Sequence, residues 1–248
     1  MLKLIKTMDF KTICFCLFFI LFSLIITLLS DLIFGSISTS FVKVLGKTLM
    51  LCLAAIALDL VWGYCGILSL GHFAFFALGG YLIGMWLMYE RTKEIIIQAF
   101  AEQLLPPTPS EIKEAIGIQI FGVVGGSEIP SIWIFADYLF IHLFLIIFIP
   151  GLLALIFGWL AFRSRVTGVY LSILTQAMTL ALSLYLLQND SGLRGNNGLS
   201  GLQNIPGFTS FPQSIISILF LWASTLALIL GFIIATFITK CKLGKLIQ

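Results

Sequence analysis

The chain has 248 residues, of which 60% are hydrophobic and only 10% are charged. A soluble domain carries about 25% charged residues, so this composition excludes an ordinary soluble protein. The mean hydropathy is +1.11, and apolar runs recur along the whole chain, which predicts an all-α, polytopic integral membrane protein. The net charge of +3 is small, and no basic patch with interleaved aromatic residues indicates a nucleic-acid partner.

Six apolar runs are each long enough to cross a bilayer as a helix. We expect spans at 12–30, 44–62, from the glycine-rich stretch 62–84 to about residue 89, 138–162, 166–187 and 214–238. The first run of 19 residues corresponds to about 28 Å of helix and exceeds the apolar region of a signal peptide. Ser36 and Ser38 mimic a cleavage site, so a cleaved signal peptide stays the alternative. Pro150-Gly151 predicts a kink in the fourth span.

The distribution of charge orients these spans. With the amino terminus in the cytoplasm, the inner segments carry eight basic side chains against the single acid Asp9. These basic residues are Lys3, Lys6, Lys11, Arg163, Arg165, Lys240, Lys242 and Lys245. The outer segments carry six basic and nine acidic side chains. Because loops rich in Lys and Arg stay in the cytoplasm, this bias favours a cytoplasmic amino terminus.

The longest polar segment is the acidic loop at 90–137, which we expect in the periplasm. Prolines at 106, 107 and 109 forbid a continuous helix there. Ser110, followed by Glu111 and Glu114, predicts a short capped helix, with Ile112 and Ile116 on one apolar face.

The stretch 62–84 has an unusual density of glycine for a membrane helix. Its six glycines are Gly63, Gly66, Gly71, Gly79, Gly80 and Gly84. Glycine permits backbone breaks and close helix contact, and lipid tolerates an unwound backbone only where protein or water covers it. Two interpretations stay open: a broken or re-entrant segment that lines a path, or two helices joined by a tight turn. For the residues from Gly71 to Gly84 spaced three and four apart, simple close packing is the favoured interpretation.

A few polar residues fall in the apolar regions. Asp59 and His72 are the ionisable ones, apart from interfacial lysines, and an ionisable residue in a membrane span is a candidate functional residue. Asp59 precedes the glycine stretch by one turn, so it is interfacial if the break is at the inner surface and path-lining if the break is deep. Thr175 and Gln176 lie mid-span, where an amide needs a partner and is expected to face the bundle.

Nothing in the chain has the pattern of an enzyme. The motifs Gly-x-Ser-x-Gly and His-Glu-x-x-His are absent, and Gly46-Lys47-Thr48 lacks the first glycine of a phosphate-binding loop, because Phe41 stands there. The five cysteines show no metal-ligand spacing, so we expect neither a metal nor a cofactor. Three classes compete: the membrane subunit of a transporter powered elsewhere, a self-sufficient secondary transporter or channel using Asp59 and His72, and a scaffold that transports nothing. A secondary carrier often has two matching broken helices, and only one glycine-rich break is visible.

Several motifs resemble one family in order along the chain. GYCGILSLGHFAFFALGGYLIGM at 63–85 resembles the G-x-x-G-x-L-S-L-G-H-x-x-F-F-x-L-G-A-Y signature of the LivM-type permeases of branched-chain amino-acid ABC importers. RVTGVYLSILTQAMTL at 165–180 resembles that family's R-x-x-G-V-Y-F-x-I-x-T segment, and GNNGL at 195–199 resembles its T-G-G-x-N-G-L loop. Arg194 stands where the family usually has glycine. DLVWGY at 59–64, TQA at 175–177 and the Asn196-Asn197 pair are most similar to the urea-specific branch, the C subunit of the urea permease.

This resemblance implies a permease subunit in the bacterial inner (plasma) membrane, paired with a sister permease, two cytoplasmic ATPase subunits and a periplasmic solute-binding protein. The candidate translocation path then comprises Asp59, Ser69, His72, Thr175, Gln176, Asn196 and Asn197. Lys242, Gly244 and Lys245 match the start of the segment that couples to the ATPase, within 239–248. We expect 1–248 to be one partial transmembrane domain, truncated at its carboxyl end. Urea is the expected solute, because neutral amides and hydroxyls can bind it, with branched-chain amino acids as the alternative.

Overall fold

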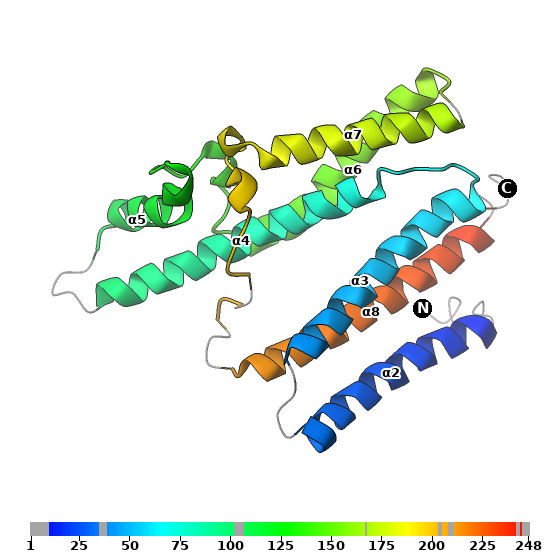
Figure 1. Cartoon of the computed structure of the whole chain (residues 1–248), viewed down its shortest axis with the longest axis horizontal. Coiled ribbons are helices and arrows are strands. Elements are labelled where there is room, and N and C mark those ends of the chain that lie inside the picture. The colour runs from blue at the N-terminus through cyan, green and yellow to red at the C-terminus, as the bar shows by residue number, and fades with distance from the viewer. Residues whose placement is uncertain are drawn as a thin grey trace. The chain divides into compact units, whose positions relative to one another are not determined.

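The computed structural model describes residues 10–34, 39–101, 107–166, 168–202, 205–207, 211–241 and 244. Within these residues the chain is helical and has no strand, which confirms the predicted all-α class (Figure 1). Its α-helices are α2 (Phe10–Phe34), α3 (Thr39–Asp59), α4 (His72–Ala101), α5 (Pro109–Phe121), α6 (Leu139–Arg163), α7 (Val169–Leu187) and α8 (Gln213–Lys240). Among the described residues, all of these except α5 are long and apolar enough to cross a membrane, in agreement with the six expected spans.

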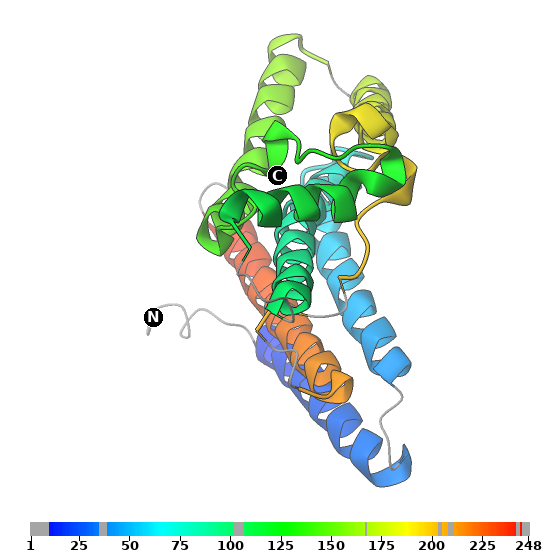
Figure 2. The same ribbon diagram turned by 90° about the vertical axis from the view of Figure 1, so that its left-hand side faces the viewer.

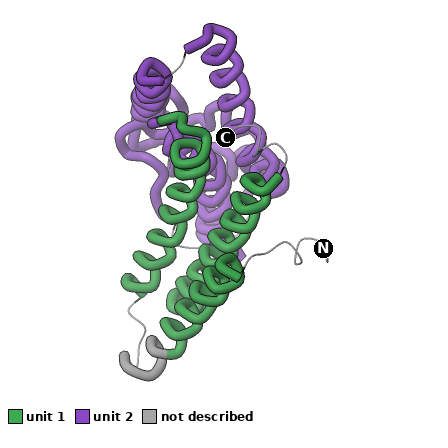
Figure 3. Tube along the Cα trace, turned by 90° about the vertical axis from the view of Figure 1, so that its right-hand side faces the viewer, with its two compact units in different colours: residues 1–68, 211–248 green, residues 69–210 purple. Residues whose placement is uncertain are grey.

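The described contacts divide the chain into two compact units. The expected single transmembrane domain stays a prediction. Unit 1 comprises residues 1–68 and 211–248, and unit 2 comprises residues 69–210 (Figure 3). The division falls within the glycine-rich stretch, so the second and third spans belong to different units.

In unit 1, α8 packs against both α3 and α2 (Figure 1 and Figure 2). Gly46 lies against Leu221 and Ser224 near the start of both α3 and α8, and Tyr64 bonds Thr239 near their ends, so α3 and α8 run parallel. When successive spans cross the membrane in opposite directions, α3 and α8 must run in the same direction, because three spans lie between them in the chain.

The first helix is fixed to α8 by one polar and one aromatic contact. The buried hydroxyls of Ser23 and Thr225 are 2.7 Å apart, and the rings of Phe15 and Phe232 stack with their centroids at 3.9 Å. These pairs set α2 antiparallel to α8. A hydrogen bond between buried hydroxyls holds membrane helices together, since lipid offers neither group a partner.

In unit 2, α4 runs antiparallel to α6 and carries an outer lobe. Gly79 packs on Ile146, and Tyr89 reaches Asp137 just before α6 begins. We use "outer lobe" for α5 together with the short helices η2 (Gly122–Val124), η3 (Ser131–Trp133) and η4 (Asn189–Ser191). Its core joins α4 and α5 to the end of α7 and includes Met85, Ile96, Ile116, Ile120, Trp133 and Leu186.

The third span is longer than predicted. Instead of ending near Tyr89, α4 continues to Ala101, into the segment 90–137 expected to be a loop. The reason is a buried stripe at helical spacing, Met88, Thr92 and Ile96, which packs on the outer lobe while charged residues occupy the other faces. The segment 90–137 is therefore largely helical.

The short helix in this segment exists, but Ser110 is not its cap. Thr108 is the N-cap: its hydroxyl accepts the Glu111 amide, and the Glu111 carboxylate accepts the Thr108 amide. Pro109 occupies the first helical position, which its fixed φ favours. The Thr108 amide, which donates to the Glu111 carboxylate, and then the Thr108 side chain hold the pKa of Glu111 below its ordinary value. Elsewhere, α6 includes Pro150 within the helix, and the kink expected there stays a prediction.

Candidate functional site: a helix break beside the middle of α7

The second span ends in a different type of helix from the one in which it begins. After α3, residues Leu60–Tyr64 form a wider π-helical turn, and Gly66 then adopts a left-handed φ of +69°. A side chain at this φ is strained, so the turn favours glycine. The chain stays non-helical until α4 begins at His72. The break inferred from the glycine density therefore exists, and its two ends are described in their separate units.

In unit 1, Asp59 lies at a helix end. Because α3 and α8 run parallel, Asp59 is at the same end of this pair as Lys240. Its side chain is exposed and borders a groove of about 300 Å³ that Thr236 and Thr239 also line. The hydroxyl of Tyr64, just after α3, links this end to the end of α8. It lies within donating distance of the carbonyl oxygens of Thr239 at 3.0 Å and Gly244 at 3.1 Å. This placement favours the interfacial interpretation of Asp59.

In unit 2, α7 satisfies the non-helical backbone before α4. The Leu70 N–H donates to the Thr175 hydroxyl at 3.0 Å, and the Thr179 hydroxyl lies 3.5 Å from the Leu70 carbonyl oxygen. Thr175 is 5% exposed and donates in turn to the Ser172 carbonyl at 2.8 Å. The Thr179 hydroxyl donates more closely to the Thr175 carbonyl, at 2.9 Å, so the Leu70 N–H has the firm partner on α7 and the Leu70 carbonyl only a long contact.

Glycine permits this close approach. A Cβ on Gly71 would lie 3.0 Å from the Met178 methyl group and 3.3 Å from the Thr175 Cβ. A side chain here would require Met178 and Thr175 to shift by a few tenths of an ångström, so glycine lets the break pack directly on α7.

The contacts with α7 locate the break along that helix. Thr175 and Thr179 flank Met178, the middle residue of this 19-residue helix, which is about 28 Å long. Leu70 and the start of α4 therefore lie beside the centre of α7. A break near the middle of a membrane span needs contacts of this kind, because lipid offers no partner to a backbone group.

The structure brings together some of the candidate path residues and separates others. Ser69 and His72 flank the dipeptide that packs on Thr175, and the buried Nδ1 of His72 has no hydrogen-bond partner among the described residues. Gln176 is exposed within unit 2 and makes no hydrogen bond inside the described ranges, so its predicted partner stays a prediction. Thr179 was missed, although its spacing of four from Thr175 places both on one face of α7.

The remaining candidates lie elsewhere. Asn196 and Asn197 are exposed in a short helix that follows α7, away from the break. Of the packing glycines, Gly84 meets Leu199, whereas Gly80 has open space around it and Gly63 lies against the Asp59 carboxylate. Gly244 accepts the Tyr64 hydroxyl, but Lys242 and Lys245 lie outside the described residues.

Arg194 stands where the family usually has glycine, and its backbone conformation and contacts show how an arginine fits there. Its φ is +65°, in the left-handed region where glycine is preferred, and its side chain is only 5% exposed. The guanidinium donates to the Ser200 hydroxyl at 2.8 Å and the Gly198 carbonyl at 3.1 Å, while its Nε has no partner in the described part of the chain. Burial lowers the pKa of Arg194.

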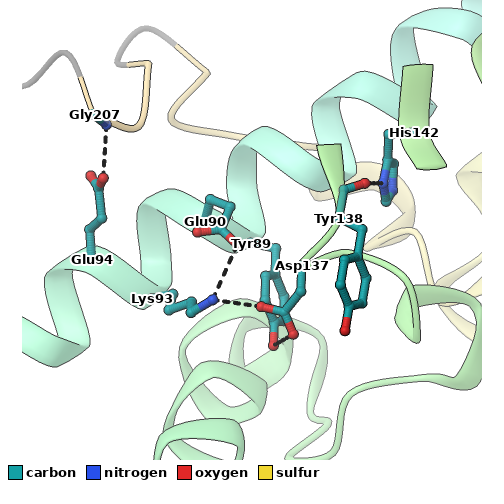
Figure 4. A network of polar contacts seen from close by, with 8 residues as sticks. All are labelled: Tyr89, Glu90, Lys93, Glu94, Asp137, Tyr138, His142 and Gly207. Carbon is teal, nitrogen blue, oxygen red and sulfur yellow. Dashed lines mark hydrogen bonds and ion pairs between the residues drawn. The ribbon is translucent and has the colours of Figure 1, made fainter. Parts of the chain in front are cut away.

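A polar cluster ties the outer part of α4 to the start of α6 (Figure 4). Lys93 lies 2.7 Å from the Asp137 carboxylate and 3.3 Å from that of Glu90, while the Tyr89 hydroxyl donates to Asp137 at 3.3 Å. On the next turn, Glu94 accepts the Gly207 amide at 2.9 Å. Lys93 is thus shared between two carboxylates, and its contact with Asp137 ties α4 to the residues just before α6.

Six apolar helices and a covered backbone break define the chain as a multi-pass membrane protein. A family model described as "Branched-chain amino acid transport system / permease component" matches residues 40–248, and the chain belongs to this family. It is accordingly a non-catalytic membrane permease component of an ABC-type transport system. The first helix, α2, lies before the residues that the family model matches. Comparisons with curated proteins and with solved structures found no match.

Proposed function

We propose that this permease component moves urea across the plasma membrane, as one of two paired permeases, through a path that passes the break beside the middle of α7. The carrying observation is the hydrogen bond from the Leu70 N–H to the Thr175 hydroxyl at 3.0 Å, which supports an unwound segment beside the middle of α7. Ser69 and His72 flank this segment and offer a hydroxyl and an imidazole without a fixed charge. Two cytoplasmic ATPase subunits supply the energy, and a periplasmic solute-binding protein delivers the solute.

The orientation rests on charge. A cytoplasmic amino terminus puts Arg163, Arg165 and Lys240 inside, and it puts the outer lobe in the periplasm. The parallel packing of α3 and α8 and the antiparallel packing of α4 and α6 are both consistent with it.

Two observations bear on the solute in opposite directions. The sequence DLVWGY at 59–64 and TQA at 175–177 resemble the urea-specific branch, which supports urea. However, α4 begins at the break, and the positive end of a helix dipole favours a carboxylate. Branched-chain amino acids are therefore the second candidate solute.

The secondary-transporter alternative has less support. A secondary carrier often has two matching broken helices, and the sequence has only one glycine-rich break.

Uptake into membrane vesicles that hold the complete transport system tests the proposal. Labelled urea and labelled leucine are compared, with ATP inside the vesicles and the solute-binding protein outside. We expect ATP-dependent urea uptake that Ser69→Ala and Thr175→Val reduce and that Ser183→Ala, a hydroxyl change elsewhere on α7, leaves unchanged. Leucine uptake without urea uptake would select the second candidate, and uptake of either solute without ATP would contradict the powered mechanism.

A further inference from the structure

The residues that join the outer lobe to α6 expose large apolar side chains outside the membrane-spanning helices. We call residues 131–138 the pre-α6 segment. Its exposed apolar side chains are each 50–66% exposed, and they are Ile132, Ile134, Phe135 and Tyr138. Apolar side chains gathered in this way, rather than scattered singly, mark a surface that another molecule covers.

Buried neighbours hold the pre-α6 segment in place. Trp133 and Ala136, at 2% and 1% exposure, belong to the core of the outer lobe. The indole Nε1 of Trp133 donates to the Gly192 carbonyl at 2.7 Å, and Asp137 lies 2.7 Å from Lys93 on α4. Because Trp133 and Ala136 already fill the core at this point, the apolar side chains between and after them stay on the surface.

The backbone of the pre-α6 segment finds its hydrogen-bond partners locally. Turn hydrogen bonds run from an N–H group to the carbonyl oxygen three residues earlier, at 2.9–3.2 Å, with the donors Trp133, Ile134, Ala136 and Tyr138. An N–H group without a partner is costly near lipid, since hydrocarbon offers no acceptor. Successive turns therefore suit a segment at the boundary of the membrane.

The position of the segment in the chain fixes its level. The span α6 begins at Leu139, five residues after Ile134. Five residues reach only about 18 Å when fully extended, and here they are coiled into turns. From residue 129 to residue 162 the only Asp, Glu, Lys or Arg is Asp137, which pairs with Lys93. The apolar character of α6 therefore extends back through the pre-α6 segment.

The exposed surface of α5 has a different character. Its exposed residues include the charged side chains Glu111, Lys113 and Glu114. The outer lobe thus carries charged side chains on α5 and apolar ones beside the start of α6. A charged surface combined with an apolar one is the pattern of structures that lie at the membrane interface.

We propose that the pre-α6 segment contacts phospholipid: Ile134, Phe135 and Tyr138 lie in the headgroup region of the leaflet in which α6 begins, and they hold the outer lobe on the membrane surface. Tyrosine suits this level, because its ring is apolar and its hydroxyl reaches water. Continuity with a membrane span favours lipid over a protein as the occupant. The contact requires only that α6 spans the membrane, so it goes beyond the proposed function and does not depend on the solute.

Fluorescence quenching of the full chain in lipid nanodiscs tests this contact. The five cysteines are replaced by alanine, and an NBD fluorophore is attached at Ile134→Cys, Phe135→Cys or, as the control on α5, Glu114→Cys. The quenchers are iodide in the water and a phospholipid with a nitroxide near its headgroup. We expect the lipid to quench more strongly than iodide at positions 134 and 135, and iodide to quench more strongly at position 114.

Two other results would overturn the proposal. Iodide quenching at positions 134 and 135 as strong as that at position 114 would show that this surface faces water. Protection from both quenchers would show that protein, such as a second copy of the chain, covers the surface in place of lipid.

A charge placed in the contact provides a second test. With the fluorophore at Phe135→Cys, Ile134→Asp should weaken quenching by the lipid and strengthen quenching by iodide, whereas Ile134→Val should change neither. Because Ile134 is 66% exposed, both variants should unfold at the same temperature in detergent, which separates loss of the lipid contact from misfolding. Quenching that Ile134→Asp leaves unaltered would overturn the role of Ile134.

Discussion

The hydroxyl of Thr175 accepts the amide of Leu70 at 3.0 Å, across 105 residues of sequence. This bond joins the non-helical segment before α4 to the centre of α7. It replaces the helical partner that the Leu70 amide lacks, so the break is a built feature of the fold.

Thr175→Val should destabilise the protein although it keeps the side chain's shape. The change leaves the partly buried Leu70 amide without its acceptor, and the loss of such a hydrogen bond costs about 0.5–1.5 kcal/mol. Thermal unfolding in detergent measures the loss, Thr175→Ser should restore most of it, and Ser183→Ala serves as the control. A Thr175→Val protein as stable as the wild type would show that the amide has another partner.

Gly71→Ala should perturb the break, whereas Gly80→Ala should not. An added methyl group at Gly71 meets Met178 and Thr175, and overpacking of this kind costs about 1–3 kcal/mol. At Gly80 nothing lies within 4 Å in unit 2. Unfolding and uptake of the two variants are compared under identical conditions. Equal effects would mean that the close contact of Gly71 with α7 does not exist in the membrane.

Asp137→Asn should loosen the link between α4 and α6. It removes an ion pair to Lys93 that is partly exposed, so we expect a loss of about 0.5–1 kcal/mol that shrinks at high salt. A double-mutant cycle with Lys93→Met isolates the pair. Additive effects of the two changes would show that the pair contributes nothing to stability.

Arg194→Gly should be more stable than Arg194→Ala. Both variants lose the bonds to Ser200 and Gly198, but only glycine relieves the left-handed backbone, a difference of about 1 kcal/mol. Thermal unfolding of the pair provides the test. An alanine variant at least as stable as the glycine variant would contradict the strained conformation.

Acid should weaken the start of α5 through Glu111. The pKa of Glu111 is lowered by its bonds with Thr108, so the capping bond is fully present above the ordinary pKa and is lost as the pH falls through the lowered one. Amide hydrogen exchange across α5 measures this, after correction for the intrinsic rate. Glu111→Gln should remove most of the pH dependence, and an unaltered dependence would refute the cap.

Sequence patterns located the six helices because long apolar runs signal membrane spans directly. They failed at the end of α4, where the buried stripe through Thr92 and Ile96 is interleaved with charges that favour a loop. They also placed the cap of α5 at Ser110, although Pro109 at the first helical position indicates Thr108.

Local sequence patterns could not predict the level of the break along α7. Glycine density predicted an interruption near Gly66 and Gly71, but its level depends on which residues of α7 lie beside it. The same limit applies to the polar face of α7. Gln176 was predicted to face the bundle because it is an amide in mid-span. The contacts with the break come instead from Thr175 and Thr179.

The most direct test of the central claim is the membrane depth of Ser69. Spin labels are placed singly at Ser69 and Asp59 in a chain whose five cysteines are replaced by alanine, and collisions with oxygen and with a water-soluble nickel complex give the depth of each label in a bilayer. We expect the label at Ser69 near the bilayer centre and the label at Asp59 near the surface. A label at Ser69 at the same depth as that at Asp59 would contradict a break beside the middle of α7.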